Sequence, residues 1–70
     1  MNLTEAIQHA KLECKDPYAQ TYLRAIPQAI DLGGTEGLHD QILYAIGNMR
    51  SWKGPLAREC KDVMRKFLKR

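Results

Sequence analysis

The chain has 70 residues and a mass of 8.0 kDa, which allows one domain near the lower size limit for independent folding. Hydrophobic residues make up 44% and charged residues 27% of the chain, and no apolar run is long enough to span a bilayer. Polar Asn2 and Thr4 follow the first Met without a basic segment, so no signal peptide is expected. The two cysteines lie 46 positions apart and make no disulfide framework, so we expect a reducing, cytoplasmic setting.

Charge is distributed unevenly along the chain. Residues 1–40 contain three Lys or Arg and six Asp or Glu, for a net charge of −3, whereas residues 41–70 contain eight and two, for a net charge of +6. A chain whose two halves carry opposite net charges can approach a polyanion with its basic half or pair head to tail with a copy of itself. Acids in first turns and bases in last turns also complement helix dipoles, which explains the same distribution without a partner.

The start of the chain predicts a helix from about Leu3 to Cys14. Asn2, followed by Glu5 three residues later, resembles a capping box. A second helix is predicted to begin at Asp16-Pro17, because Asp is a good N-cap and Pro at the first helical position loses no hydrogen bond.

We expect the second helix to continue towards Leu32, with a kink or break near Arg24–Pro27, because a proline cannot donate a backbone hydrogen bond to the preceding turn. The next two residues, Gly33-Gly34, are predicted to end this segment, since glycine adopts the left-handed conformation of helix C-termini without steric cost.

Thr35 is the next predicted N-cap, of a third helix from about Glu36 to Met49. Gly54-Pro55 opens the last helix, which has the most regular apolar spacing of the chain, at Leu56, Cys60, Val63, Met64, Phe67 and Leu68. The sequence therefore predicts an all-α fold: a single domain over residues 1–70, built as a compact three- or four-helix bundle.

The residues that carry catalytic or metal chemistry are few and scattered. Cys14 and Cys60 lie on the apolar faces of their helices, where we expect buried, inert thiols. His9 and His39 are expected to be surface histidines, and the tight ligand pairs of zinc modules are absent, so no metal or cofactor is predicted. Without a nucleophile–base set or a glycine-rich phosphate loop, we do not expect an enzyme.

The last helix has a basic face opposite its apolar face. Four basic residues fall within about 80° of one another at 100° per residue, namely Arg58, Lys61, Arg65 and Lys69. This face can neutralise phosphates, meet an acidic protein surface, or simply be solvated. Asp62 can pair with Arg58, Arg65 and Lys66 and so reduce the positive potential of this face. The connection Asn48–Gly54 is long for a helix-turn-helix, which disfavours sequence-specific DNA binding.

Aromatic side chains accompany basic ones near the start of the basic half. Tyr44 points away from the apolar face of the third helix, and Trp52 lies in the connection between Arg50 and Lys53. Aromatic residues beside Arg and Lys are typical of protein-binding hot spots and of platforms on which bases stack. Alternatively, Trp52 folds back to cap the small core, and both interpretations can hold together.

One sequence pattern covers residues 41–70 and, more loosely, Tyr22 to Ala29. It consists of Gln41-Ile42-Leu43-Tyr44-Ala45-Ile46-Gly47-Asn48, then Trp52-Lys53-Gly54, Ala57-Arg58, Lys61 and Phe67. This pattern resembles short open reading frames of bacteriophages and mobile elements, which have an aromatic-bearing helix, an Asn, a Trp-basic-Gly turn and a basic last helix. The resemblance implies a phage or prophage origin and brings no catalytic residue.

Together these features predict a non-enzymatic binding protein, encoded by a phage or mobile element, that binds a host macromolecule as an inhibitor or adaptor. The predicted contact surface comprises Tyr44, Asn48, Arg50, Trp52, Lys53, Arg58, Lys61 and Arg65. A host protein is the expected partner. A small nucleic-acid-binding regulator and a self-assembling homo-oligomer are the alternatives. Leu12 and Leu43 are expected to remain outside the core, available to a partner.

Overall fold

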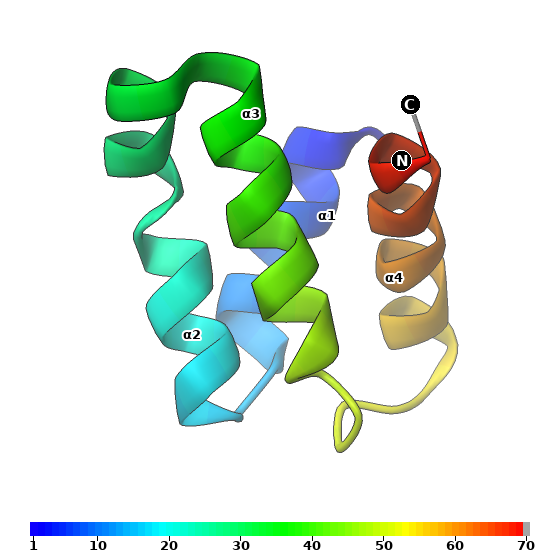
Figure 1. Cartoon of the computed structure of the whole chain (residues 1–70). Helices are drawn as coiled ribbons and strands as arrows, with labels where there is room; N and C mark the ends of the chain where they lie inside the picture. The colour runs from blue at the N-terminus through cyan, green and yellow to red at the C-terminus, as the bar shows by residue number, and fades with distance from the viewer. Residues whose placement is uncertain (70) are drawn as a thin grey trace.

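The computed structural model describes residues 1–69, which form four helices joined by short links and contain no strand. In chain order the helices are α1 (Leu3–Glu13), α2 (Pro17–Arg24), α3 (Ile26–Gly47) and α4 (Pro55–Leu68) (Figure 1). The prediction of an all-α bundle is therefore confirmed, with four helices rather than three. No helix among residues 1–69 combines the length and the apolar character needed to cross a membrane.

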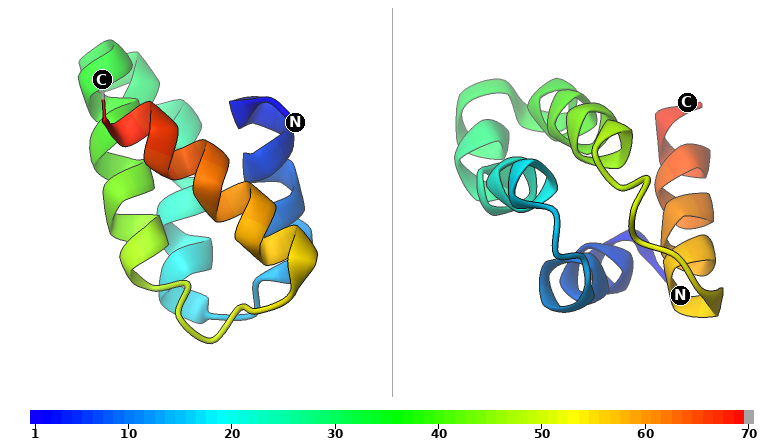
Figure 2. Two further views of the ribbon diagram at one scale, coloured as in Figure 1. Left: turned by 90° about the vertical axis from the view of Figure 1, so that its right-hand side faces the viewer. Right: turned by 90° about the horizontal axis from the view of Figure 1, so that it is seen from below.

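The four helices surround a common core. Each packs against two others: α1 and α3 both contact α2 and α4. Seen from below, α1 lies diagonally opposite α3, and α2 lies opposite α4 (Figure 2, right). The ribbon of α4 runs obliquely across its neighbours (Figure 2, left). This arrangement leaves one side of α3 and one side of α4 facing outward.

The predicted helix starts of α1 and α2 are confirmed by their caps. The Glu5 backbone N–H donates to Asn2 Oδ1 (2.8 Å) and the Asn2 backbone N–H donates to Glu5 Oε1 (3.0 Å), which completes a capping box. Asp16 Oδ1 accepts hydrogen bonds from the backbone N–H groups of Tyr18 (2.9 Å) and Ala19 (3.0 Å). Each cap satisfies donors that a helix start leaves without an internal partner.

The break near Pro27 is confirmed, because α2 ends at Arg24 and α3 begins at Ile26. The predicted helix end at Gly33-Gly34 is confirmed: α3 consists of two helical segments that meet at a kink, where Gly34 leaves helical geometry (φ 59°, ψ −137°). Glycine adopts this conformation without a Cβ clash. Thr35, predicted to be the next N-cap, is the first residue after the kink.

The two parts of α3 on either side of this kink touch at Gly37. A Cβ atom built at this position would lie 2.1 Å from the carbonyl oxygen of Ala29 and 2.8 Å from its carbonyl carbon. Only glycine allows such a close backbone approach. Gly37 therefore fixes the angle at which the long part of α3, residues 35–47, leaves the kink.

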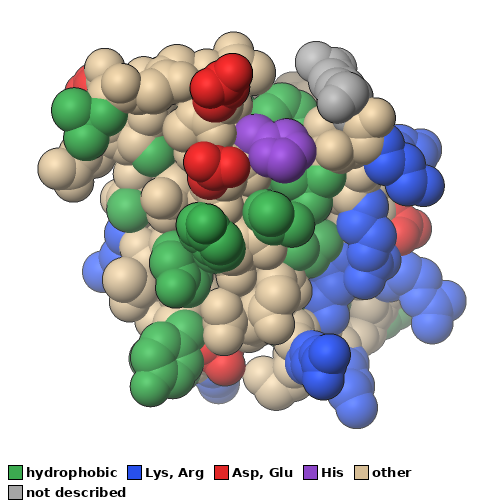
Figure 3. All heavy atoms as spheres, in the orientation of Figure 1, with side chains coloured by type: hydrophobic (Ala, Val, Ile, Leu, Met, Phe, Trp, Pro, Cys, Tyr) green, Lys and Arg blue, Asp and Glu red, His purple; other side chains and the backbone are tan. Residues whose placement is uncertain are grey.

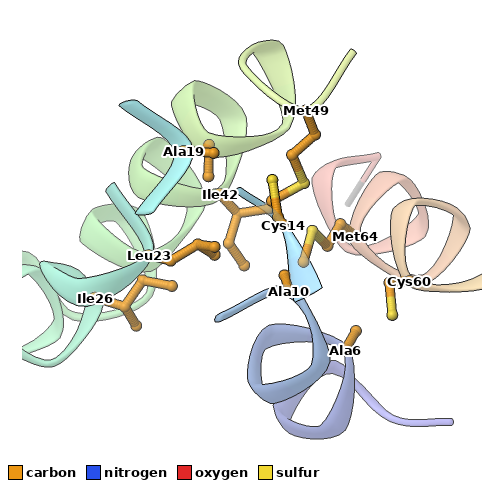
Figure 4. Packing of buried hydrophobic residues seen from close by; sticks show 11 residues of the cluster. Ala6, Ala10, Cys14, Ala19, Leu23, Ile26, Ile42, Met49, Cys60 and Met64 are labelled. Carbon is orange, nitrogen blue, oxygen red and sulfur yellow. The ribbon is translucent and has the colours of Figure 1, made fainter. Parts of the chain in front are cut away.

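The core consists largely of small and sulfur-containing side chains (Figure 4). Among residues 1–69 the buried hydrophobic residues are Ala6, Ala10, Cys14, Ala19, Leu23, Ile26, Ile42, Ala45, Met49, Ala57, Cys60 and Met64. Five of these twelve are alanines, and the predicted burial of both cysteines is confirmed. Large hydrophobic side chains remain exposed, including Leu12 and Leu43 as predicted. The interior thus uses only part of the chain's hydrophobic surface.

Candidate functional site

An open groove lies between the link after α3 and the start of α4. It has a volume of about 680 Å³ and is lined by Trp52, Lys53, Gly54, Pro55, Arg58, Glu59, Lys61, Asp62 and Arg65. We call it the basic groove. Five residues of the predicted contact surface meet in it, namely Trp52, Lys53, Arg58, Lys61 and Arg65.

The link that forms one wall is held at both ends. Met49 is fully buried, and its carbonyl oxygen accepts a hydrogen bond from the backbone N–H of Trp52 (3.1 Å). Gly54 has a φ of 116°, which glycine tolerates and other residues do not, and Pro55 then starts α4. The link therefore turns sharply and places Trp52 beside the first turns of α4.

Lys61 fastens the link to α4. Its Nζ donates a hydrogen bond to the carbonyl oxygen of Trp52 (2.5 Å). Burial lowers the pKa of Lys61, and the positive charges of Arg65 and Lys53 add to this effect, although the nearby Cys14 opposes it. Lys61, predicted to be a contact residue, is thus also a positioning residue for the groove wall.

Trp52 lies at the boundary between the core and the basic groove. Its side chain is half-buried and packs against the core, yet it also lines the basic groove. An indole in this position offers a large apolar contact area whose orientation is already fixed. Replacing Trp52 would therefore affect both the stability of the fold and the shape of the groove.

The basic groove also contains two carboxylates, Glu59 and Asp62. Arg65 Nη1 donates to Asp62 Oδ1 (3.4 Å), so this predicted pair is confirmed, whereas no pairing of Asp62 with Arg58 or Lys66 occurs among residues 1–69. Four cationic and two anionic side chains give the lining a net charge of +2. The surface is thus basic but mixed in sign.

The other three residues of the predicted surface lie outside the basic groove. Tyr44 packs against Tyr22 of α2, with 5.5 Å between the ring centroids, and is 51% exposed. Asn48 Nδ2 donates to the carbonyl oxygen of Tyr44 (2.9 Å) and so serves the end of α3. Arg50 is exposed but does not line the groove. The single predicted surface is therefore divided, because Tyr44 lies against α2 whereas the basic groove lies beside α4.

A second, smaller depression was not predicted. It has a volume of about 270 Å³, lies between α3 and α4, and is lined by Thr35, Glu36, His39, Asp40 and Phe67. We call it the acidic hollow. The spacing of Glu36, His39 and Asp40 on one helix face was visible in the sequence, but the contribution of α4 depends on tertiary packing.

His39 belongs to the interface between α3 and α4. Its Nε2 lies 3.3 Å from the carbonyl oxygen of Leu68, its Nδ1 lies 3.8 Å from Asp40 Oδ1, and its ring centroid lies 6.2 Å from that of Phe67. His39 thus contacts α4 from a half-buried position at the surface, and His9 is half-buried as well. In a chain this small, residues at the flank of a helix already reach a neighbouring helix.

The titratable residues form no metal cluster in the part of the chain that the structure describes: no group of three or more His, Cys, Asp or Glu could hold an ion. Burial raises the pKa of the Cys60 thiol, and the negative charge of Glu59 adds to this effect. Since the thiolate is the reactive form, Cys60 is poorly suited to act as a nucleophile.

Known proteins provide no relative from which a function could be transferred. The chain matches no protein-family model, no curated protein and no solved structure.

Proposed function

We propose that this is a non-enzymatic binding protein whose basic groove recognises an acidic surface on a protein partner. The observation that carries the proposal is the meeting of Trp52 with four cationic side chains in one open groove. Tryptophan and arginine are the residues that most often dominate the energy of protein interfaces. The same groove supplies both an apolar anchor and charged contacts around it.

Each part of the groove has a distinct role in this proposal. Arg58 and Arg65 offer planar guanidinium groups, which bind carboxylates through paired hydrogen bonds. Trp52 supplies the apolar anchor. Because Lys61 already holds the link against α4, the partner does not have to order this wall, and less entropy is lost on binding.

The mixed charge of the lining favours a protein partner over nucleic acid. Glu59 and Asp62 would repel a continuous row of phosphates, whereas a protein surface can place its own cations beside them. The second candidate, a nucleic-acid-binding regulator, is favoured by the three- and four-residue spacing of Arg58, Lys61 and Arg65. Phosphate binding would weaken linearly in a plot of log affinity against log salt, with a slope that counts the phosphates neutralised.

The resemblance to open reading frames of phages and mobile elements indicates where the partner would be found. In this proposal the partner is a protein of the bacterial host, and the small protein acts in the host cytoplasm as an inhibitor or adaptor. Occupying an acidic surface on a larger protein requires no catalytic chemistry from the chain.

Affinity capture from bacterial lysate, with and without nuclease treatment, tests this proposal. Arg58→Glu reverses one charge in the basic groove. Arg24→Glu makes the same change at the exposed end of α2, a helix that does not touch α4. We expect one nuclease-resistant protein to be retained by the wild type and by Arg24→Glu, and lost with Arg58→Glu. Recovery that nuclease abolishes would favour the regulator, and equal recovery with all three would exclude the groove.

A further inference from the structure

The outer face of α3 carries exposed hydrophobic side chains that the basic groove does not use. Leu43 is 47% and Tyr44 is 51% exposed, in the C-terminal half of the long part of α3. Figure 3 shows hydrophobic side chains gathered over α2 and α3, while Lys and Arg side chains gather over α4 and at the lower edge. Hydrophobic side chains that gather on one exposed face are available to a partner.

Charges of opposite sign flank this hydrophobic centre. Glu36, Asp40 and Leu43 follow one another at spacings of four and three, so they share one face of α3. Beyond the other end of the helix lies the exposed Arg50. Along the chain, the face thus runs from acidic through hydrophobic to basic. We call the set Glu36, Asp40, Leu43, Tyr44 and Arg50 the α3 face.

We propose that the α3 faces of two copies pack antiparallel about a twofold axis at Leu43, with Arg50 of the partner copy entering the acidic hollow. Glu36 lies seven residues before Leu43, about 10 Å along the helix, and Arg50 lies just beyond the other end of α3. Antiparallel pairing therefore places the acidic end of each copy beside the Arg50 end of the other. The contact between Glu36 of one copy and Arg50 of the other then forms twice, as a twofold interface requires.

The charge pattern identifies a second copy as the occupant. An acidic hollow of about 270 Å³ lined by Glu36 and Asp40 suits a guanidinium, and Arg50 is an exposed arginine that follows the opposite end of α3. With five alanines among its twelve buried hydrophobic residues, the core of this 70-residue chain provides little burial, and a partner copy would add to it. The α3 face shares no residue with the basic groove, so a dimer would present two grooves.

Charge reversal across the twofold axis tests this pairing by sedimentation equilibrium from micromolar to millimolar concentration. Glu36→Arg places arginine against Arg50 of the partner copy, and Arg50→Glu places glutamate against Glu36. We expect each variant alone to dimerise about tenfold more weakly than the wild type, since two attractive pairs become repulsive. An equimolar mixture of the two variants restores both pairs and is expected to form heterodimers at wild-type strength.

Two control variants change the net charge by the same amounts as Glu36→Arg and Arg50→Glu. Glu13→Arg lies at the end of α1, diagonally opposite α3, and Arg58→Glu lies in the basic groove; both residues are exposed, and both variants should dimerise like the wild type. A wild type that stays monomeric at millimolar concentration overturns the proposal. So does a mixture no stronger than its components. Because Arg58→Glu removes partner capture but leaves dimerisation intact, failure of the dimer and failure of the groove are distinguishable.

Discussion

Replacing Gly37 by alanine tests the packing that sets the angle of α3. A Cβ atom at this position would meet the Ala29 carbonyl oxygen at 2.1 Å, far inside van der Waals contact, and the obstacle is backbone rather than a flexible side chain. The two parts of α3 would have to separate by more than 1 Å to restore an ordinary contact distance. Such a movement disturbs Leu38 and Ile42, which pack in or against the core.

The expected loss of stability follows from two opposing effects. Overpacking of this kind costs about 1–3 kcal/mol, and the better helix propensity of alanine returns up to about 1 kcal/mol. We expect a net loss of about 1–2 kcal/mol, a large share of the about 3–5 kcal/mol that a core of this size supplies. For a domain of this length each 1 kcal/mol lowers Tm by about 4–8 °C.

Gly33→Ala is the matched control, because nothing lies within 4 Å of a Cβ at this position and its φ is not positive. This variant should be about 0.5–1 kcal/mol more stable than the wild type. Urea unfolding followed by circular dichroism at fixed protein concentration measures both variants. A Gly37→Ala protein as stable as Gly33→Ala would refute the close approach between the two parts of α3.

Three further variants test other contacts. Asp16→Ala removes both cap hydrogen bonds of α2 and should cost about 1 kcal/mol, seen as a Tm lower by about 4–8 °C. Lys61→Met releases the link from α4, so uncharged acrylamide should quench Trp52 fluorescence more strongly than in Arg58→Met, which removes the same charge but not this hydrogen bond. The raised pKa of Cys60 means that the unfolded thiol loses its proton first, so stability should fall as pH rises above about 8.5. Urea unfolding at pH 7 and 9.5 should show a smaller loss for Cys60→Ala; an equal loss would contradict the raised pKa.

Local signals made the helix starts predictable. The capping box of Asn2 and the pair Asp16-Pro17 act through residues two or three positions away, so the sequence contains the whole interaction. Gly33-Gly34 is also a local signal, because the departure from helical geometry occurs at Gly34 itself. The angle between the two helical segments is not local, since it depends on how closely Gly37 approaches Ala29.

The candidate site was predictable only in part, for a similar reason. Helical spacing placed Arg58, Lys61 and Arg65 on one face of α4, and this face does line the basic groove. The attachment of Lys61 to the carbonyl oxygen of Trp52 depends on how the link folds back, which spacing does not determine. The contact between Tyr44 and Tyr22 likewise joins α3 to α2 across 22 positions of sequence.

Trp52 is the only tryptophan of the chain and lies in the basic groove, so its fluorescence reports directly on the proposed site. The most direct measurement is a titration of the wild type and of Arg58→Glu with a glutamate-rich peptide and with single-stranded DNA, each at low and moderate salt. We predict that the peptide changes the Trp52 emission at both salt concentrations and that Arg58→Glu abolishes this response. A response to DNA alone, or a peptide response that Arg58→Glu leaves unchanged, would contradict the assignment of the basic groove as a site for acidic protein surfaces.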